Sequence, residues 1–146
     1  MFDITQPHVQ LYILNLVLAL VSGTLIGAER ESKGKPAGIS TQTLVMGAAV
    51  TFTFISSNIG ASDPSRIAAQ IVSGVGFLGA GIILKSERAQ HITNLTTAAS
   101  IWFSAAIGMA LGFNMYVIAI AATVYAMISA RIPAINKQTP DDPAEK

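Results

Sequence analysis

Residues 92–130 read ITNLTTAASIWFSAAIGMALGFNMYVIAIAATVYAMISA and contain no Asp, Glu, Lys, Arg or His. As one helix, this run would be about 58 Å long, roughly twice the ~30 Å hydrocarbon core of a lipid bilayer. We therefore expect it to cross a membrane twice. The turn is expected at residues 112–114, because Gly112 and Asn114 tolerate turn conformations that other residues resist.

Three earlier runs are also free of charged residues, namely residues 9–28, 36–62 and 67–84. Charged residues make up 12% of the chain, against about 25% in an average soluble domain. A bilayer imposes this separation, because a charge at the hydrocarbon centre is costly. The sequence predicts an all-α integral membrane bundle of five transmembrane helices, over residues 9–29, 39–58, 66–85, 96–112 and 115–131.

The nine Lys and Arg residues test this topology independently. With five crossings, eight of them fall on one side of the membrane and Arg66 alone falls on the other; if the last run did not cross twice, the split would be five to four. The positive-inside rule therefore favours an outside N-terminus and a cytoplasmic C-terminus. We expect a transmembrane domain over residues 1–134 and a short polar cytoplasmic tail over residues 135–146.

Several classes of function are not expected. The net charge of +1 and the lack of a basic cluster argue against nucleic acid as a partner, and the chain has no cysteine for disulfides or thiolate catalysis. His8 and His91 have no ligand-spaced partner, so we expect neither an enzyme nor a cofactor, with a magnesium ion as the one candidate. The G-x-G-x-x-G at Gly74, Gly76 and Gly79 lies inside a membrane span without a preceding strand, so it is not a dinucleotide motif.

Small residues are spaced so that helices can approach closely, which is how helices associate in lipid. We expect helix packing, within a tight bundle or at a dimer seam, to involve Gly23, Gly27, Gly74, Gly76, Gly79, Gly81, Gly108 and Gly112. The glycine-rich third helix has an alternative interpretation. It would be broken or re-entrant, with unwound carbonyl groups that coordinate an ion.

The third helix is expected to begin with Asp63 as its N-cap and Pro64 in its first position. Arg66 is the one basic residue expected outside, and Gln70 and Ser73 continue its face of the helix. Such a polar stripe at the mouth of a bundle is either a seam of interhelical hydrogen bonds or the entry to a pathway.

On the inner side, Glu29 and Glu31 lie at the end of the first helix, where carboxylates oppose the helix dipole. One interpretation is a cluster of salt bridges with the cations expected on that side, Arg30, Lys33, Lys35, Lys85 and Arg88. The other is a cation or partner site built on the two carboxylates, with Glu87 nearby. Carboxylates bind magnesium through several retained waters.

The fourth helix is expected to begin at Thr96 or Thr97 as the N-cap, after Asn94 in a left-handed conformation.

Four stretches together resemble one family: GTLIGAERE at residues 23–31, KPAGIST at 35–41, DPSRIAAQIVSGVGFLGAG at 63–81 and LTTAASIW at 95–102. They are similar to the MgtC/SapB family of bacterial inner-membrane proteins, over roughly residues 10–130. The resemblance implies a multi-pass protein connected with growth or survival at low magnesium. The resemblance also implies links to virulence inside macrophages and to restraint of the proton-driven ATP synthase, both of which are associated with the family's namesake.

The chain departs from the family pattern in two ways. It is expected to lack the soluble ACT-like domain of the family's namesake, and with it any ligand sensing there. Asn94 stands where such sequences commonly have Gly, and Thr96 where some have Asn. A partner contact ascribed to that Asn is therefore not carried over to this chain.

Three functions remain as hypotheses. The first is a regulator that contacts another membrane complex such as the membrane sector of ATP synthase, and the second is an oligomeric transporter or channel for magnesium or another cation. The third is a structural module, for example a homodimer; a homo-oligomer is expected in general, with a dimer favoured. The candidate ion or partner site comprises Glu29, Arg30, Glu31, Asp63, Arg66, Gln70, Asn94, Thr96 and Thr97.

Overall fold

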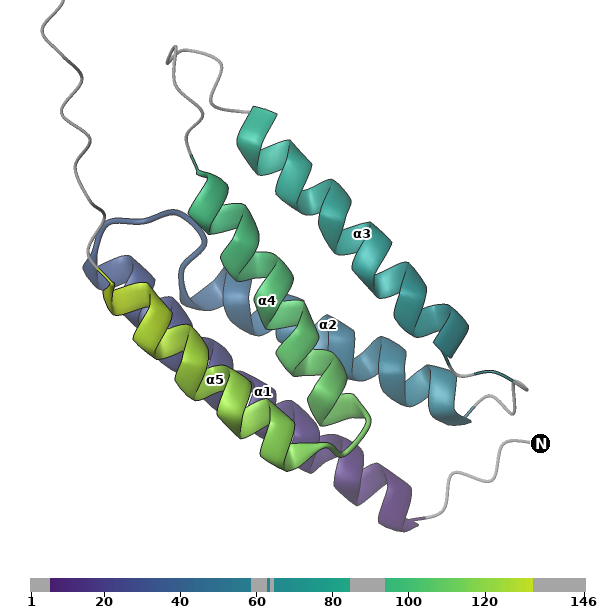
Figure 1. The fold of residues 1–146 in the computed structure, drawn as a ribbon. Helices are drawn as coiled ribbons and strands as arrows, with labels where there is room; N and C mark the ends of the chain where they lie inside the picture. The colour runs from purple at the N-terminus through teal and green to yellow at the C-terminus, as the bar shows by residue number, and fades with distance from the viewer. Residues whose placement is uncertain (1–5, 59–62, 64, 85–93, 133–146) are drawn as a thin grey trace, which may run out of the picture.

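The computed structural model describes residues 6–58, 63, 65–84 and 94–132 of the chain. It contains five helices, α1 Gln6–Ser32, α2 Ile39–Asn58, α3 Ser65–Leu84, α4 Leu95–Gly112 and α5 Tyr116–Arg131 (Figure 1). These described residues include no strand. The prediction of an all-α bundle of five helices is confirmed. The predicted tail, residues 135–146, and Pro64, Lys85, Glu87, Arg88 and His91 lie outside the described residues.

Helix length and composition suit a bilayer. In the described part of the chain, α1, α2, α3 and α4 are long and apolar enough to cross a membrane, and α5 is a shorter apolar helix of 16 residues. The protein is therefore a multi-pass membrane protein.

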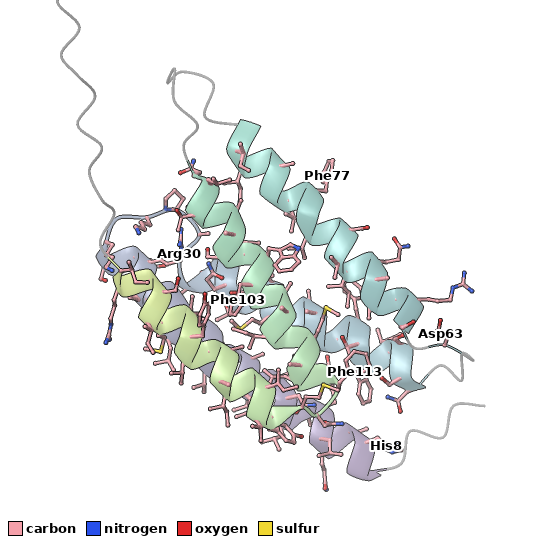
Figure 2. All side chains as sticks on the ribbon, in the orientation of Figure 1. His8, Arg30, Asp63, Phe77, Phe103 and Phe113 are labelled. Atoms are coloured by element: carbon pink, nitrogen blue, oxygen red, sulfur yellow. The ribbon has the colours of Figure 1, made fainter. Side chains whose placement is uncertain are left out.

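Successive helices run in opposite directions, so the bundle has two ends (Figure 1). Figure 2 shows Arg30 at one end and His8 and Asp63 at the other; we call these the Arg30 end and the Asp63 end. The helix α1 begins at the Asp63 end and α5 finishes at the Arg30 end. This is the arrangement that an odd number of crossings requires, whereas the side of the membrane that each end faces stays a prediction.

The helix α2 is the centre of the fold, because its largest interfaces are with α1 on one side and α4 on the other. Met46 and Val50 of α2 and Ile107 of α4 are fully buried at this centre. The helix α5 packs against α4 and α1, whereas α3 contacts only α4 and α2 among the described helices.

Glycines of α1 and α4 allow α2 to approach both neighbours. A Cβ atom built on Gly108 would lie 2.5 Å from the Met46 carbonyl oxygen, and one on Gly112 would lie 2.6 Å from Thr53 Cβ. On α1, a Cβ on Gly23 would lie 2.8 Å from Thr43 Cα, and one on Gly27 would overlap the backbone of Ile39. Any larger residue at these positions would push α2 away from its neighbours.

The helix α3 is unbroken from Ser65 to Leu84, so the broken or re-entrant alternative is wrong. It buries a single stripe, Ala68, Ile71, Val75 and Gly79. Of its glycines, Gly79 faces the Ala98 side chain, but a Cβ on Gly74, Gly76 or Gly81 would have no atom within 4 Å. Three of the four glycines of α3 therefore do not pack against any described residue of this chain.

The predicted turn after α4 is confirmed. Asn114 adopts a left-handed conformation with φ of 59°, and the N–H of Met115 donates to the Ala110 carbonyl at 2.8 Å. Gly112 serves the contact with Thr53 instead, as the last residue of α4.

We predict that two glycine substitutions differ in their effect on the free energy of unfolding. Gly108→Ala should lower the free energy of unfolding by about 1–3 kcal/mol, because the new methyl group forces α4 away from the α2 backbone. Gly81→Ala should not destabilise the protein, because the new methyl group meets open space and Ala favours a helix. Unfolding of both variants in mixed detergent micelles checks this, and equal losses of stability would contradict it.

Candidate functional site at the Arg30 end

The loop between α1 and α2 wraps around the side chain of Arg30, which is only 3% exposed. Its Nε donates to the Pro36 and Ala37 carbonyl oxygens at 3.1 and 3.2 Å. Its Nη2 donates to the Pro36 carbonyl at 2.8 Å and to Thr97 Oγ1 of α4 at 2.7 Å. Gly34 and Ala37, with φ of 62° and 61°, give the loop this shape. Arg30 therefore ties three segments together, α1, the loop and α4.

A second buried network lies next to Arg30 and is centred on Gln42, which is fully buried at the start of α2. Gln42 Nε2 donates to the Ala37 carbonyl and to Ser100 Oγ, each at 3.1 Å. The hydroxyl of Ser104 donates to Gln42 Oε1 at 2.5 Å. The Ala37 carbonyl thus accepts from both Arg30 and Gln42, so the two networks form one polar cluster.

The two carboxylates of this end have local partners. Glu29 Oε1 lies 2.5 Å from Lys33 Nζ, and Lys33 also donates to the Ala130 carbonyl of α5 at 2.6 Å. Glu31 Oε1 accepts the N–H of Ile39 at 2.9 Å. The predicted salt-bridge cluster is therefore confirmed for Glu29 and Lys33. Among the described residues, Arg30 and Glu31 form hydrogen bonds with neutral groups, and Glu29 attracts Arg30 electrostatically without a salt bridge to it. Two expected partners, Lys85 and Arg88, lie outside the described residues.

Two features of the cluster bear on metal binding. Within the described ranges, no group of three or more His, Cys, Asp or Glu side chains is placed to hold a metal ion. Glu87, which the second interpretation of the carboxylates included, lies outside those ranges. What the described cluster does is to fix the ends of α1, α2 and α4 relative to one another.

A model of the family described as "MgtC family" matches residues 16–135. The chain belongs to the MgtC family. The resemblance drawn from the four sequence stretches is thereby confirmed, and the multi-pass membrane protein is one of bacterial type.

Two curated relatives are similar to this chain over most of its length. Protein MgtC of Salmonella typhimurium is 46% identical over 113 residues, which cover 77% of this chain and 48% of that protein. The putative magnesium transporter YhiD of Escherichia coli is 43% identical over 127 residues, 80% of this chain and 58% of that protein. The chain spans about half the length of the curated relatives it matches. No solved structure matches it.

The structure places the predicted site residues of this MgtC-family chain in two separate groups. Arg30 and Thr97 are hydrogen-bonded at the Arg30 end, where the remaining members of this group also lie, namely Glu29, Glu31, Asn94 and Thr96. Asp63, before the start of α3, and Arg66 and Gln70 of α3 are exposed toward the Asp63 end.

The polar stripe of α3 is exposed along its length, and Gln70 borders a groove between α3 and α2. Arg66, Gln70 and Ser73 are all exposed, and no described residue forms an interhelical hydrogen bond with them. Among the described residues, the stripe is therefore not a seam of interhelical hydrogen bonds. The alternative, the entry to a pathway, stays a prediction.

The predicted start of α4 needs one correction. The cap is Asn94, which is left-handed as predicted with φ of 64°, and its carbonyl accepts the N–H of Ala98 at 3.0 Å. Neither Thr96 nor Thr97 is the N-cap, because α4 already begins at Leu95. The hydroxyl of Thr97 is used by Arg30 instead.

Sequence reasoning missed Gln42, Ser100 and Ser104. The signal for them was available, because a glutamine in a charge-free membrane run needs a partner in protein rather than in lipid. It also missed a side-chain hydrogen bond at the Asp63 end, in which Asn15 Nδ2 of α1 donates to Oδ1 of Asn114, in the turn before α5, at 2.9 Å.

Two Thr→Val substitutions test how much the hydrogen bond between Arg30 and Thr97 of α4 contributes to the free energy of unfolding. Thr97→Val should lower the free energy of unfolding by about 1.5 kcal/mol, because it removes a bond to a buried charged donor and keeps the side-chain shape. Thr123→Val is the matched control with little expected change, because the buried Thr123 hydroxyl donates only to the Ala119 carbonyl of its own helix. Equal stability of the two variants would contradict the structural role given to Arg30.

The start of α3 should be sensitive to acid. The Ser65 hydroxyl and then the Ser65 N–H donate to Asp63 Oδ1 and hold the pKa of Asp63 below its ordinary value. The stabilisation is therefore fully present above about pH 4, the ordinary aspartate pKa, and is lost as the pH falls through the lowered one.

Amide hydrogen exchange at Ser65 and Arg66 measures this effect. Protection factors should fall below about pH 4 in the wild type and stay constant in Asp63→Asn, which does not titrate. The same acid response in both proteins would assign the change to another group.

Proposed function

We propose that this chain is a bacterial inner-membrane protein of the response to low magnesium and that it acts without catalysis, by contact with another membrane complex such as the membrane sector of ATP synthase. Membership of the MgtC family supports the connection with magnesium. The proposed orientation has the Arg30 end in the cytoplasm, because Arg30, Lys33, Lys35 and Arg131 lie at this end and Arg66 alone among the described Lys and Arg lies at the other.

The observation that carries the proposal is a groove of about 520 Å³ between α2 and α3. Its walls are apolar except for Gln70, and Gly74 lies in its α3 wall with open space in front of it. Leu44 of α2 and Leu78 of α3 line the groove and are 73% and 51% exposed. The groove therefore opens to the surroundings of the bundle along a helix that buries a single stripe.

A transmembrane helix of another protein fits such a surface. Helices associate in lipid through close packing at small residues and through a few interhelical hydrogen bonds. Gly74 offers the close approach, and the amide of Gln70 offers a hydrogen bond inside an apolar groove. The side chain of Phe77, which is 81% exposed on α3, adds apolar contact area next to it.

The test is ATP-driven proton pumping by ATP synthase in inverted bacterial membrane vesicles that contain this chain. The wild-type chain should reduce pumping. Gly74→Leu should remove most of this effect, because the larger side chain occupies the groove, and its Cβ atom would have no atom within 4 Å. Ala121→Leu is the control, since it enlarges an exposed small residue on α5, and it should behave as wild type.

Pumping that the wild-type chain leaves unchanged would overturn the proposal of ATP synthase as partner. Equal inhibition by the two variants would instead show that the groove is not the contact. Crosslinking of the Phe77→Cys variant tests for a further outcome, a homodimer. Crosslinks between two copies of this chain would place a second copy, rather than another protein, on α3.

A second candidate function is a small oligomeric transporter or channel for magnesium or another cation. It is favoured by the 43% identity with a relative whose printed name is putative magnesium transporter. Flux of magnesium into proteoliposomes of the purified chain tests it, with Glu29→Gln as the variant that should lose flux. Absence of flux in the folded wild-type protein would reject this candidate.

A further inference from the structure

A second cavity, of about 500 Å³, lies between α1, α4 and α5 at the Arg30 end, apart from the groove between α2 and α3. Its polar lining includes the two cations Arg30 and Lys35 and the hydroxyls of Thr96 and Ser129. Its apolar lining includes Phe103 and Tyr125.

The polar and apolar parts of this cavity are separated along the helix axes. Thr96 lies in the first turn of α4, and Phe103 lies about 10 Å further along that helix. Ser129 lies in the last turn of α5, and Tyr125 precedes it by about 6 Å. Figure 2 likewise shows Phe103 nearer than Arg30 to the middle of the bundle. The cavity is therefore cationic near the membrane surface and apolar toward the membrane interior.

The positive charges of Arg30 and Lys35 are not neutralised by other described residues that line the cavity. None of the described residues that line it is acidic. Outside the lining, Glu29 attracts Arg30 electrostatically but forms its salt bridge with Lys33, and Glu31 accepts the N–H of Ile39. Among the described residues, Arg30 donates hydrogen bonds only to neutral oxygens. The N-terminus of α4 adds the positive end of a helix dipole. A site of this kind is complementary to an anion.

We propose that this cavity binds an anionic glycerophospholipid, with the phosphate diester beside Arg30 and Lys35 and an acyl chain against Phe103 and Tyr125. The apolar half has no use in binding a free inorganic anion. Tyr125 is 63% exposed, so the wall opens toward the acyl chains of the bilayer. A zwitterionic ethanolamine lipid is disfavoured, because its ammonium group would approach Lys35. Basic pockets between transmembrane helices are a known mode of lipid headgroup recognition.

Native mass spectrometry of the full chain in detergent tests the proposal, with phosphatidylglycerol and phosphatidylethanolamine of identical acyl chains as probes. Phosphatidylglycerol should bind more tightly than phosphatidylethanolamine. Lys35→Gln should weaken phosphatidylglycerol binding about fivefold, the effect of one basic residue at an anionic headgroup. Arg131→Gln removes an exposed cation of the same end that does not line the cavity, so it should change binding less than about twofold.

Both substitutions are on exposed side chains, so the fold should be preserved, and circular dichroism verifies it. Equal binding of the two lipids, or equal loss in the two variants, would overturn the proposal. Displacement of phosphatidylglycerol by an equal concentration of inorganic phosphate would reduce the site to an anion site and would also overturn it. A photoreactive acyl chain should label the peptides with Phe103 or Tyr125, and labelling confined to α3 would contradict the assigned cavity.

Discussion

The close approach of α2 to both α1 and α4 is the constraint on which the rest of the fold depends. Lipid tails are as apolar as leucine side chains, so burying apolar surface does not by itself hold helices together in a membrane. Contact must come from close packing and from polar bonds between helices. Gly23 and Gly27 admit α2 on one side, and Gly108 and Gly112 admit it on the other. The Gln42 network and the bond from Arg30 to Thr97 then join these same three helices at one end.

The number and the approximate bounds of the helices were predictable from the sequence, because a bilayer excludes charge and the charges therefore mark the ends of most crossings. The boundary between α4 and α5 carries no charge and was predicted from the length of the run and from Gly112 and Asn114. The faces of the helices were less predictable. In water an apolar stripe marks the buried side of a helix, but here lipid-facing and protein-facing sides are both apolar. Gly108 and Gly74 lie in similar small-residue patterns, yet Gly108 touches the backbone of α2 and Gly74 meets open space. The difference depends on the partner helix, which the local sequence does not contain.

The candidate site was predictable as a place but not as a set of bonds. Charge sorting assigned Glu29, Arg30 and Glu31 to one end of the bundle, and opposite charges suggested salt bridges. In the structure, carbonyl groups of the loop, and no described carboxylate, accept hydrogen bonds from Arg30. The loop folds back over Arg30 because Gly34 and Ala37 have positive φ angles. An alanine with positive φ has no signal in the sequence. The polar stripe of α3 was misjudged for the same reason as its glycines, since nothing in the stripe marks which side faces protein.

The two halves of the bundle are held by different forces, and this difference bears on how the chain acts. Side chains of α1, α2 and α4 are linked by interhelical hydrogen bonds, and Asn15 and Lys33 of α1 extend the linkage to Asn114 before α5 and to Ala130 at its end. No described side chain of α3 forms such a bond; α3 is held by apolar contacts along one stripe. A partner helix that binds along α3 would therefore meet a surface whose adjustment breaks no described interhelical hydrogen bond. The cationic cavity is lined by α1, α4, α5 and the loop after α1, and the groove by α2 and α3. The proposed partner contact and the proposed lipid contact therefore use different helices of one small bundle.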